Sequence, residues 1–129
     1  MNRQIAPSTV APPAANYALA VKSEGAVIWL HTSGIVGTRP DGSLPSDIEA
    51  QAEVIWASLL AILAEAGMGT SDVVSITTYV VAGHHAALAK VMAARDAALQ
   101  GHRVASTLVT VPALARPEWK VEIALIAAQ

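Results

Sequence analysis

Glu122 is the residue of this chain whose chemical type and sequence context best suit catalysis. It alternates with Lys120, Ala124 and Ile126 in a segment typical of a β-strand, so its carboxylate shares a face with apolar side chains. Such a carboxylate either pairs with Lys120 at a sheet edge or is held inside a cleft. Within a cleft it could take a proton from water and act as a general base.

Three other side chains near the C-terminal strands are candidates for contacting a ligand. Arg116 and Trp119 belong to one loop, in which the indole could cap a pocket, and Arg103 precedes the strand before that loop. A single exposed arginine is more often a solvated surface residue. The alternative for Trp119 is packing in a core or an interface.

The composition argues against several other kinds of site. The chain has no cysteine, which excludes disulfides, thiolate nucleophiles and zinc ribbons. The adjacent His84 and His85 would point about 100° apart on a helix, so they are poorly placed to share one metal ion. The segment from Gly34 to Gly37 lacks the lysine of a phosphate-binding loop. We therefore expect neither a metal nor a cofactor.

Charge and hydropathy indicate the environment of the protein. Eight basic and ten acidic residues give a net charge of −2, unlike the basic surface of a nucleic-acid-binding protein. No signal peptide is evident, and the apolar runs are too short to cross a membrane, which predicts a cytoplasmic protein. However, 53% of the residues are hydrophobic and only 14% are charged, more apolar surface than a small domain can bury alone. This excess predicts that copies of the chain associate.

Hydrophobic periodicity predicts a single α+β domain over residues 1–129. One helix is expected between a capping box at Ser46 and Glu49 and a stop at Gly67, and a second helix over 84–99. Strands are expected at 17–22, 26–33, 73–81, 106–111 and 120–127, after an extended segment at 1–16. The order is β-β-α-β-α-β-β, with both helices on one face of the sheet and neighbouring subunits covering the other.

The order and spacing of several short motifs resemble those of the RidA (YjgF) family of reactive-intermediate deaminases. The motifs are Asn16-Tyr17, Thr32-Ser33-Gly34, Ala66-Gly67-Met68, Asp72-Val73-Val74, Thr77-Thr78-Tyr79 and Val121-Glu122-Ile123. This resemblance covers nearly the whole chain. It implies a homotrimer of chorismate-mutase-like architecture, with small-molecule clefts between adjacent subunits.

The resemblance also implies roles for single residues. Tyr17 would wall the pocket, Ser33 would contact the ligand, and Glu122 would orient a water for attack on an imine carbon. Ser106 occupies a position in the same pocket, and its neighbour Thr107 is a further candidate for ligand binding. From their types alone, the two serines could equally serve turns, and the tyrosine could simply pack its ring.

Ser106 stands where deaminating members of that family have an arginine that holds the substrate carboxylate. Ile35 and Met92 also depart from the family, in which glutamine and asparagine are frequent at these positions. A serine hydroxyl gives one neutral hydrogen bond, worth about 0.5–1.5 kcal/mol, and a guanidinium–carboxylate pair is stronger. A 2-imino acid should therefore bind poorly unless another cation, Arg103 or Arg116, reaches the cleft.

Three functions remain open on the sequence alone. The first is a deaminase or hydrolase with Glu122 and Ser106 in its catalytic site, acting on an imine, enamine or related metabolite other than the usual 2-imino acids. The second is a trimer that binds a small molecule without catalysis. The third, a ribonuclease, is disfavoured by the balanced charge.

Overall fold

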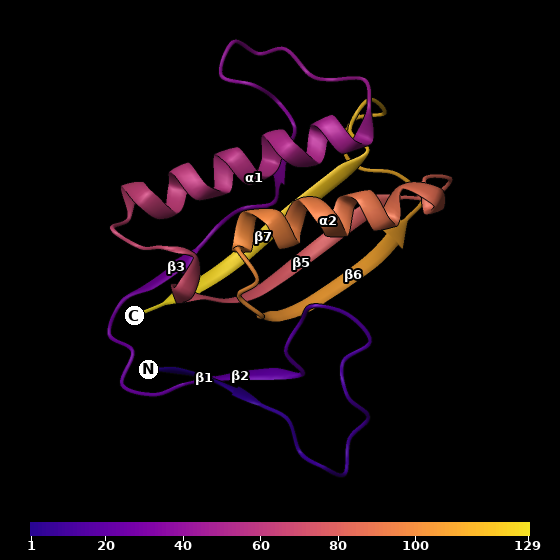
Figure 1. The fold of residues 1–129 in the computed structure, drawn as a ribbon. Coiled ribbons are helices and arrows are strands. Elements are labelled where there is room, and N and C mark those ends of the chain that lie inside the picture. Colours follow the sequence, from indigo (N-terminus) through magenta and orange to yellow (C-terminus); the bar gives the residue numbers. More distant parts are fainter.

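Two helices cover one face of a mixed β-sheet in the computed structural model, which describes all of residues 1–129 (Figure 1). The helices are α1 (Ile48–Glu65) and α2 (Leu88–Leu99). The strands of the main sheet are β3 (Trp29–His31), β4 (Ile35–Val36), β5 (Val73–Val81), β6 (Ala105–Val111) and β7 (Val121–Ala128). Their order is β3-β7-β5-β6, β4 also pairs with β7, and β5 and β6 run parallel. The expected α+β class, with both helices on one face, is confirmed.

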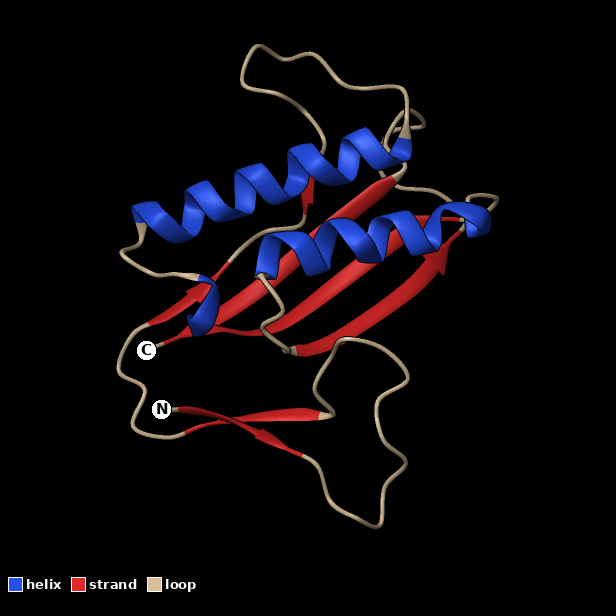
Figure 2. Ribbon diagram, in the orientation of Figure 1, coloured by secondary structure: helices blue, strands red, loops and turns tan.

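A separate two-stranded sheet lies beneath the β6 edge, formed by β1 (Asn2–Ile5) and β2 (Ala20–Ser23) (Figure 2). The expected extended segment at 1–16 therefore contains a strand, β1, and the strand expected at 17–22 begins three residues later. The two strands are joined by a long loop, so no local sequence signal reveals their pairing. The end of this loop is attached to the main sheet, because Ala18 forms a bridge with Ala105 and its N–H donates to the Val104 carbonyl at 2.8 Å.

The strand expected over 26–33 is much shorter than predicted. Only Trp29–His31 form β3, and β4 lies in the segment expected to be a loop. The interruption has a local cause at Thr32. Its hydroxyl accepts a hydrogen bond from the Leu125 N–H at 3.0 Å. In a continuous pair of strands, this N–H of β7 would instead bond to a backbone carbonyl.

Helix α1 begins one residue later than the capping box predicts. Asp47, and not Ser46, is the N-cap, and its carboxylate accepts from the Ala50 N–H at 3.2 Å. The carbonyl of Ser46 instead accepts a hydrogen bond from the Lys120 ammonium. The expected helix stop is confirmed, because Gly67 follows the helix with a φ of 71°, in the left-handed region.

Helix α2 is shorter than the predicted 84–99. A 3₁₀ turn over His85–Ala87 precedes it, and the helix proper begins at Leu88. At its other end, Gln100 adopts a left-handed conformation with a φ of 52° before Gly101. Neither helix is long and apolar enough to span a lipid bilayer.

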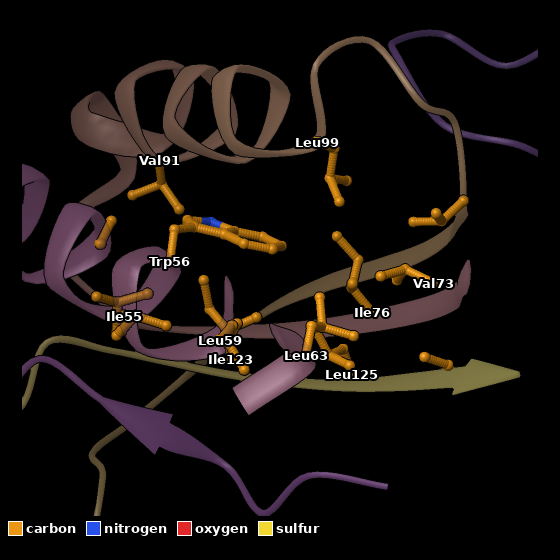
Figure 3. Packing of buried hydrophobic residues seen from close by; sticks show 14 of the residues in the cluster. Ile55, Trp56, Leu59, Leu63, Val73, Ile76, Val91, Leu99, Ile123 and Leu125 are labelled. Carbon is orange, nitrogen blue, oxygen red and sulfur yellow. The ribbon is translucent and has the colours of Figure 1, made fainter. Parts of the chain in front are cut away.

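The hydrophobic core lies between the two helices and the sheet. Trp56 of α1 packs beneath Val91 of α2, and Leu99 and Ile76 close the core toward the β6 side (Figure 3). Complete burial of such a side chain contributes about 1.5–3 kcal/mol. The opposite face of the sheet carries no helix, and Trp29 on that face is 51% exposed.

Gln51 is a fully buried polar residue of α1 that joins three segments of the chain. Its Nε2 donates to the Pro45 carbonyl at 2.8 Å and to the Glu118 carbonyl at 3.1 Å. Its Oε1 accepts from the Lys120 N–H at 3.0 Å. The amide therefore fixes the loop before α1 and the start of β7 relative to each other.

We predict that Gln51→Leu lowers the free energy of unfolding by about 2–4 kcal/mol, because it leaves a backbone N–H and two carbonyls without their partner. Urea denaturation monitored by tryptophan fluorescence measures this change. Gln129→Leu, which alters an exposed glutamine, is the control and should change stability by less than about 0.5 kcal/mol. Equal stability of both variants would contradict the role given to Gln51.

Candidate functional site

Glu122 lies on the face of β7 that points away from the helices. Its register neighbour on β4 is Val36, which places the preceding Ser33 and Gly34 beside it. A Cβ atom on Gly34 would lie 2.6 Å from the Glu122 Cδ, so the carboxylate occupies the space that a side chain there would need. We call Ser33, Gly34 and Glu122 the carboxylate half-site.

The carboxylate of Glu122 is half-buried and has no ion pair or side-chain hydrogen bond in the structure. The alternative that Lys120 pairs with it is not observed, since the ammonium of Lys120 bonds to the Ser46 carbonyl. A carboxylate without a protein partner has its oxygens free to accept hydrogen bonds from a ligand or a water molecule.

A cavity of about 180 Å³ opens on the same face of the sheet. Strand β5 contributes two hydroxyl side chains, those of Ser75 and Thr77, and β3 contributes His31. Ala124, two residues beyond Glu122 on β7, also lines it. The cavity is thus a small hollow of mixed polar and apolar lining, on the same face of the sheet as the carboxylate half-site.

Tyr17 and Arg103 both lie at the opposite edge of the sheet, where the chain on either side of Ala18 and Ala105 is bridged. Tyr17 is half-buried, and its hydroxyl accepts from the Ala14 N–H at 3.3 Å. The neighbouring Asn16 accepts a hydrogen bond from the Arg103 guanidinium at 3.1 Å. Asn16 also donates to a carboxylate oxygen of Asp96 at 3.1 Å, which ties the N-terminal loop to α2.

Ser106 belongs to the same network through a residue that the sequence analysis missed. Arg95 of α2 donates from Nη1 to the Ser106 hydroxyl at 3.4 Å and from Nε to Asp96 at 2.9 Å. Arg95 is only 6% exposed. Asn16, Arg95, Asp96, Arg103 and Ser106 together form what we call the guanidinium cluster.

The sequence does contain a signal for Arg95. Val91, Arg95 and Leu99 follow one another at intervals of four, so the arginine lies in the apolar row of α2. A charged residue in such a row is either paired or functional. Arg95 is paired with Asp96 through Nε and Nη2, and its Nη1 donates to Ser106.

The expected cations do not approach Ser106 directly. Arg103 bonds to Asn16, and the Arg116 guanidinium lies over the Trp119 ring at 5.5 Å from its centroid. This cation–π pair stays within the loop between β6 and β7. Arg95 is the cation that contacts Ser106.

One chain does not bring Glu122 and Ser106 together. Ser106 pairs with Ile76 and faces the helices, whereas Glu122 pairs with Tyr79 and faces the open side. Strand β5 lies between their strands, so two strand spacings, about 10 Å, also separate them. Thr107 is exposed and points to the face opposite Ser106.

Two features lie outside both groups of residues. Hydrogen bonds from the Ser43 hydroxyl and N–H lower the pKa of the Asp41 carboxyl in the loop before α1. Beside this loop, Arg39, Pro40 and small residues of α1 line a second cavity of about 350 Å³. No cluster of three or more histidine or acidic side chains is placed to hold a metal ion.

The fold, the carboxylate half-site and the guanidinium cluster define a small α+β protein with potential ligand-binding groups at both edges of its sheet. The sequence model of the endoribonuclease L-PSP family matches residues 8–129. The chain therefore belongs to this family, which is also known as the RidA (YjgF) family. A search of curated proteins found no significant match.

Solved structures of the same family have the same architecture. YyfB of Yersinia pestis, described as a protein of unknown function of the conserved Rid family, is 33% identical with a TM-score of 0.90, over 99% of this chain and 98% of that one. A YjgF/YER057c/UK114 family member from Mycobacterium tuberculosis is 26% identical, with a TM-score of 0.68 over 90% and 89% of the two chains. Escherichia coli TdcF, solved with bound serine, is 25% identical, with a TM-score of 0.69 over 96% and 93%.

Two nearby glycines test how Glu122 is held. We predict that Gly34→Ala displaces the Glu122 carboxylate yet changes the free energy of unfolding by less than about 1 kcal/mol, because a flexible side chain can move away. NMR of the Glu122 side-chain carboxyl carbon would report the displacement.

Gly37→Ala is the matched comparison, since its Cβ would lie 2.8 Å from the backbone Cα of Gln51. Helix backbone yields less readily, so this variant should lose about 1–3 kcal/mol of stability. An unchanged Glu122 resonance in Gly34→Ala would show that the carboxylate does not occupy the space beside Gly34.

Proposed function

We propose that this protein is a homotrimeric enzyme that hydrolyses a small imine or enamine in clefts between its subunits. The observation that carries the proposal is the unpaired, half-buried carboxylate of Glu122, held against Gly34 on the face of the sheet that also bears a small, partly polar cavity. The serine bound to TdcF, a family member, supports a small molecule as the ligand.

The placement of the carboxylate half-site and the guanidinium cluster supports a cleft shared between subunits. The carboxylate half-site lies toward the β3 and β4 edge of the sheet, and the guanidinium cluster lies at the β6 edge. If the β3 and β4 edge of one copy packs against the β6 edge of a neighbouring copy, the two groups would meet. Within a single chain they do not meet. The apolar side chains Trp29 and Val109, on the face without helices, are 51% and 39% exposed and would be covered by such an association.

The proposed reaction uses water as the second reactant. Glu122 takes a proton from water as the oxygen adds to the imine carbon, and the imine nitrogen gains a proton. The resulting carbinolamine then breaks its carbon–nitrogen bond, with the proton of its hydroxyl lost and the leaving nitrogen protonated. The products are a carbonyl compound and ammonia. Ser33 would donate to the ligand, and Tyr17 would close the wall of the pocket.

Glu122→Gln tests the chemistry directly. The amide keeps the size of the side chain but does not act as a base, so we predict a loss of about 10²–10⁴-fold in the rate of ammonia release from a small imine that carries no carboxylate next to its imine carbon. Ligand affinity should change much less than the rate.

Glu53→Gln, which alters an exposed carboxylate on α1, is the control and should keep the wild-type rate. A Glu122→Gln variant with the full rate would overturn the assignment of the base. A wild-type protein that binds small molecules and catalyses no release would instead support the alternative, a binding trimer without catalysis.

The oligomeric state is a separate prediction. Sedimentation equilibrium should give three times the chain mass, and Trp29→Asp should lower the average mass because it buries a charge in the contact. Ala57→Asp, on the exposed side of α1, should leave the trimer intact. A wild-type monomer at micromolar concentration would refute both the trimer and the shared cleft.

A further inference from the structure

We propose that Tyr79 is the proton donor of the proposed reaction and protonates the nitrogen atom of the ligand while Glu122 takes a proton from water. This inference rests on the proposed function, in which the imine nitrogen gains a proton and so needs a donor. It adds a catalytic residue on β5 that belongs neither to the carboxylate half-site nor to the guanidinium cluster.

Strand pairing places Tyr79 directly beside Glu122. The two residues are register partners in the antiparallel pair of β5 and β7. Side chains alternate along both strands, and those of Tyr79 and Glu122 belong to the less buried set, on the face without helices. Register partners on one face of an antiparallel pair have Cβ atoms about 4.5–5.5 Å apart. A small ligand that contacts the carboxylate is therefore within reach of the phenol.

The hydroxyl of Tyr79 is free to act on a ligand. The chain has two tyrosines, and only the hydroxyl of Tyr17 forms a hydrogen bond within the chain. The Tyr79 side chain is half-buried, and its oxygen is not enclosed by protein. Tyrosine acts as an acid in catalysis when its hydroxyl can reach the reacting group. An unused proton donor thus lies next to the unpaired carboxylate of Glu122.

The charged groups around the site are poorly suited to this role. The ammonium of Lys120, two residues before Glu122 on β7, bonds to the Ser46 carbonyl and is directed toward the loop before α1. A guanidinium does not lose a proton in proteins, so the guanidinium cluster of a neighbouring copy could bind a ligand but could not protonate it.

The other polar side chains on this face are either too weakly acidic or too distant. Thr77 lies opposite Ala124, one pair further along the two strands, and its aliphatic hydroxyl is a much weaker acid than a phenol. His31 lies opposite Ile126, four residues from Glu122 along β7, which corresponds to about 13 Å. Tyr79 is therefore the acid best placed to work together with Glu122.

The proton transfers form a closed cycle. As Glu122 takes a proton from water and the carbon–oxygen bond forms, the electron pair of the C=N bond moves to nitrogen, which takes the phenol proton of Tyr79. The phenolate then removes the hydroxyl proton of the carbinolamine, and the protonated carboxyl of Glu122 gives its proton to the leaving nitrogen. The carbon–nitrogen bond breaks, which releases a carbonyl compound and ammonia. Both side chains return to their starting states.

Tyr79→Phe removes the hydroxyl and keeps the ring. With a small imine that carries no carboxylate, we expect kcat for ammonia release to fall about 10²-fold or more and KM to stay within about threefold, because the hydroxyl acts in the proton-transfer step. Thr110→Val is the control. It removes an exposed hydroxyl from β6, at the register partner of the buried Val80, and should keep the wild-type kcat.

Replacement of Tyr79 by difluorotyrosine separates proton donation from packing and keeps the test valid if Tyr79→Phe does not fold. Fluorine makes the phenol more acidic at nearly unchanged size, so the alkaline limb of the kcat profile should move to lower pH. A profile that fluorination leaves unchanged, or a full kcat in folded Tyr79→Phe, overturns the inference. If Glu122→Gln still abolishes ammonia release in that case, the proposed function survives while Tyr79 loses its role. A wild-type protein that releases no ammonia overturns both.

Discussion

The buried side-chain amide of Gln51 determines how helix α1 and the last strand of the sheet meet. It holds the carbonyls of Pro45 and Glu118 and the N–H of Lys120, so β7 starts at a fixed place against the helix. Because side chains alternate along a strand, that start decides which face each later residue occupies. A shift by one residue would bury Glu122 in the core and expose its apolar neighbours.

The sheet built on this constraint has one covered face and one open face, and its polar groups divide between them. Glu122 lies on the open face with Gly34, whereas Ser106 faces the helices and contacts Arg95. Each group is incomplete as a catalytic site. The first group has an unpaired carboxylate without a cation, and the second has cations but no unpaired carboxylate, so the proposed reaction would need a partner copy that brings the opposite edge.

Local sequence patterns predicted the elements that are long and periodic. The helix ended by Gly67 and the buried strand over 73–81 are confirmed because burial of one face repeats along each of them. The errors fall where a side chain or a remote segment competes with the pattern. The hydroxyl of Thr32 interrupts a predicted strand, Asp47 replaces Ser46 as the helix cap, and β1 pairs with a strand beyond a long loop.

The sequence by itself determined the two-helix α+β layout, the family, and Glu122 as a carboxylate that alternates with apolar residues along the last strand. These depend on periodicity and on short motifs, which are local properties of the chain. Tertiary structure alone decided which cation accompanies Ser106. Arg95 lies eleven positions earlier, on a different element, and reaches the serine because α2 packs across the sheet next to β6. Contacts of this kind depend on the packing of a helix against a sheet, which no local pattern specifies.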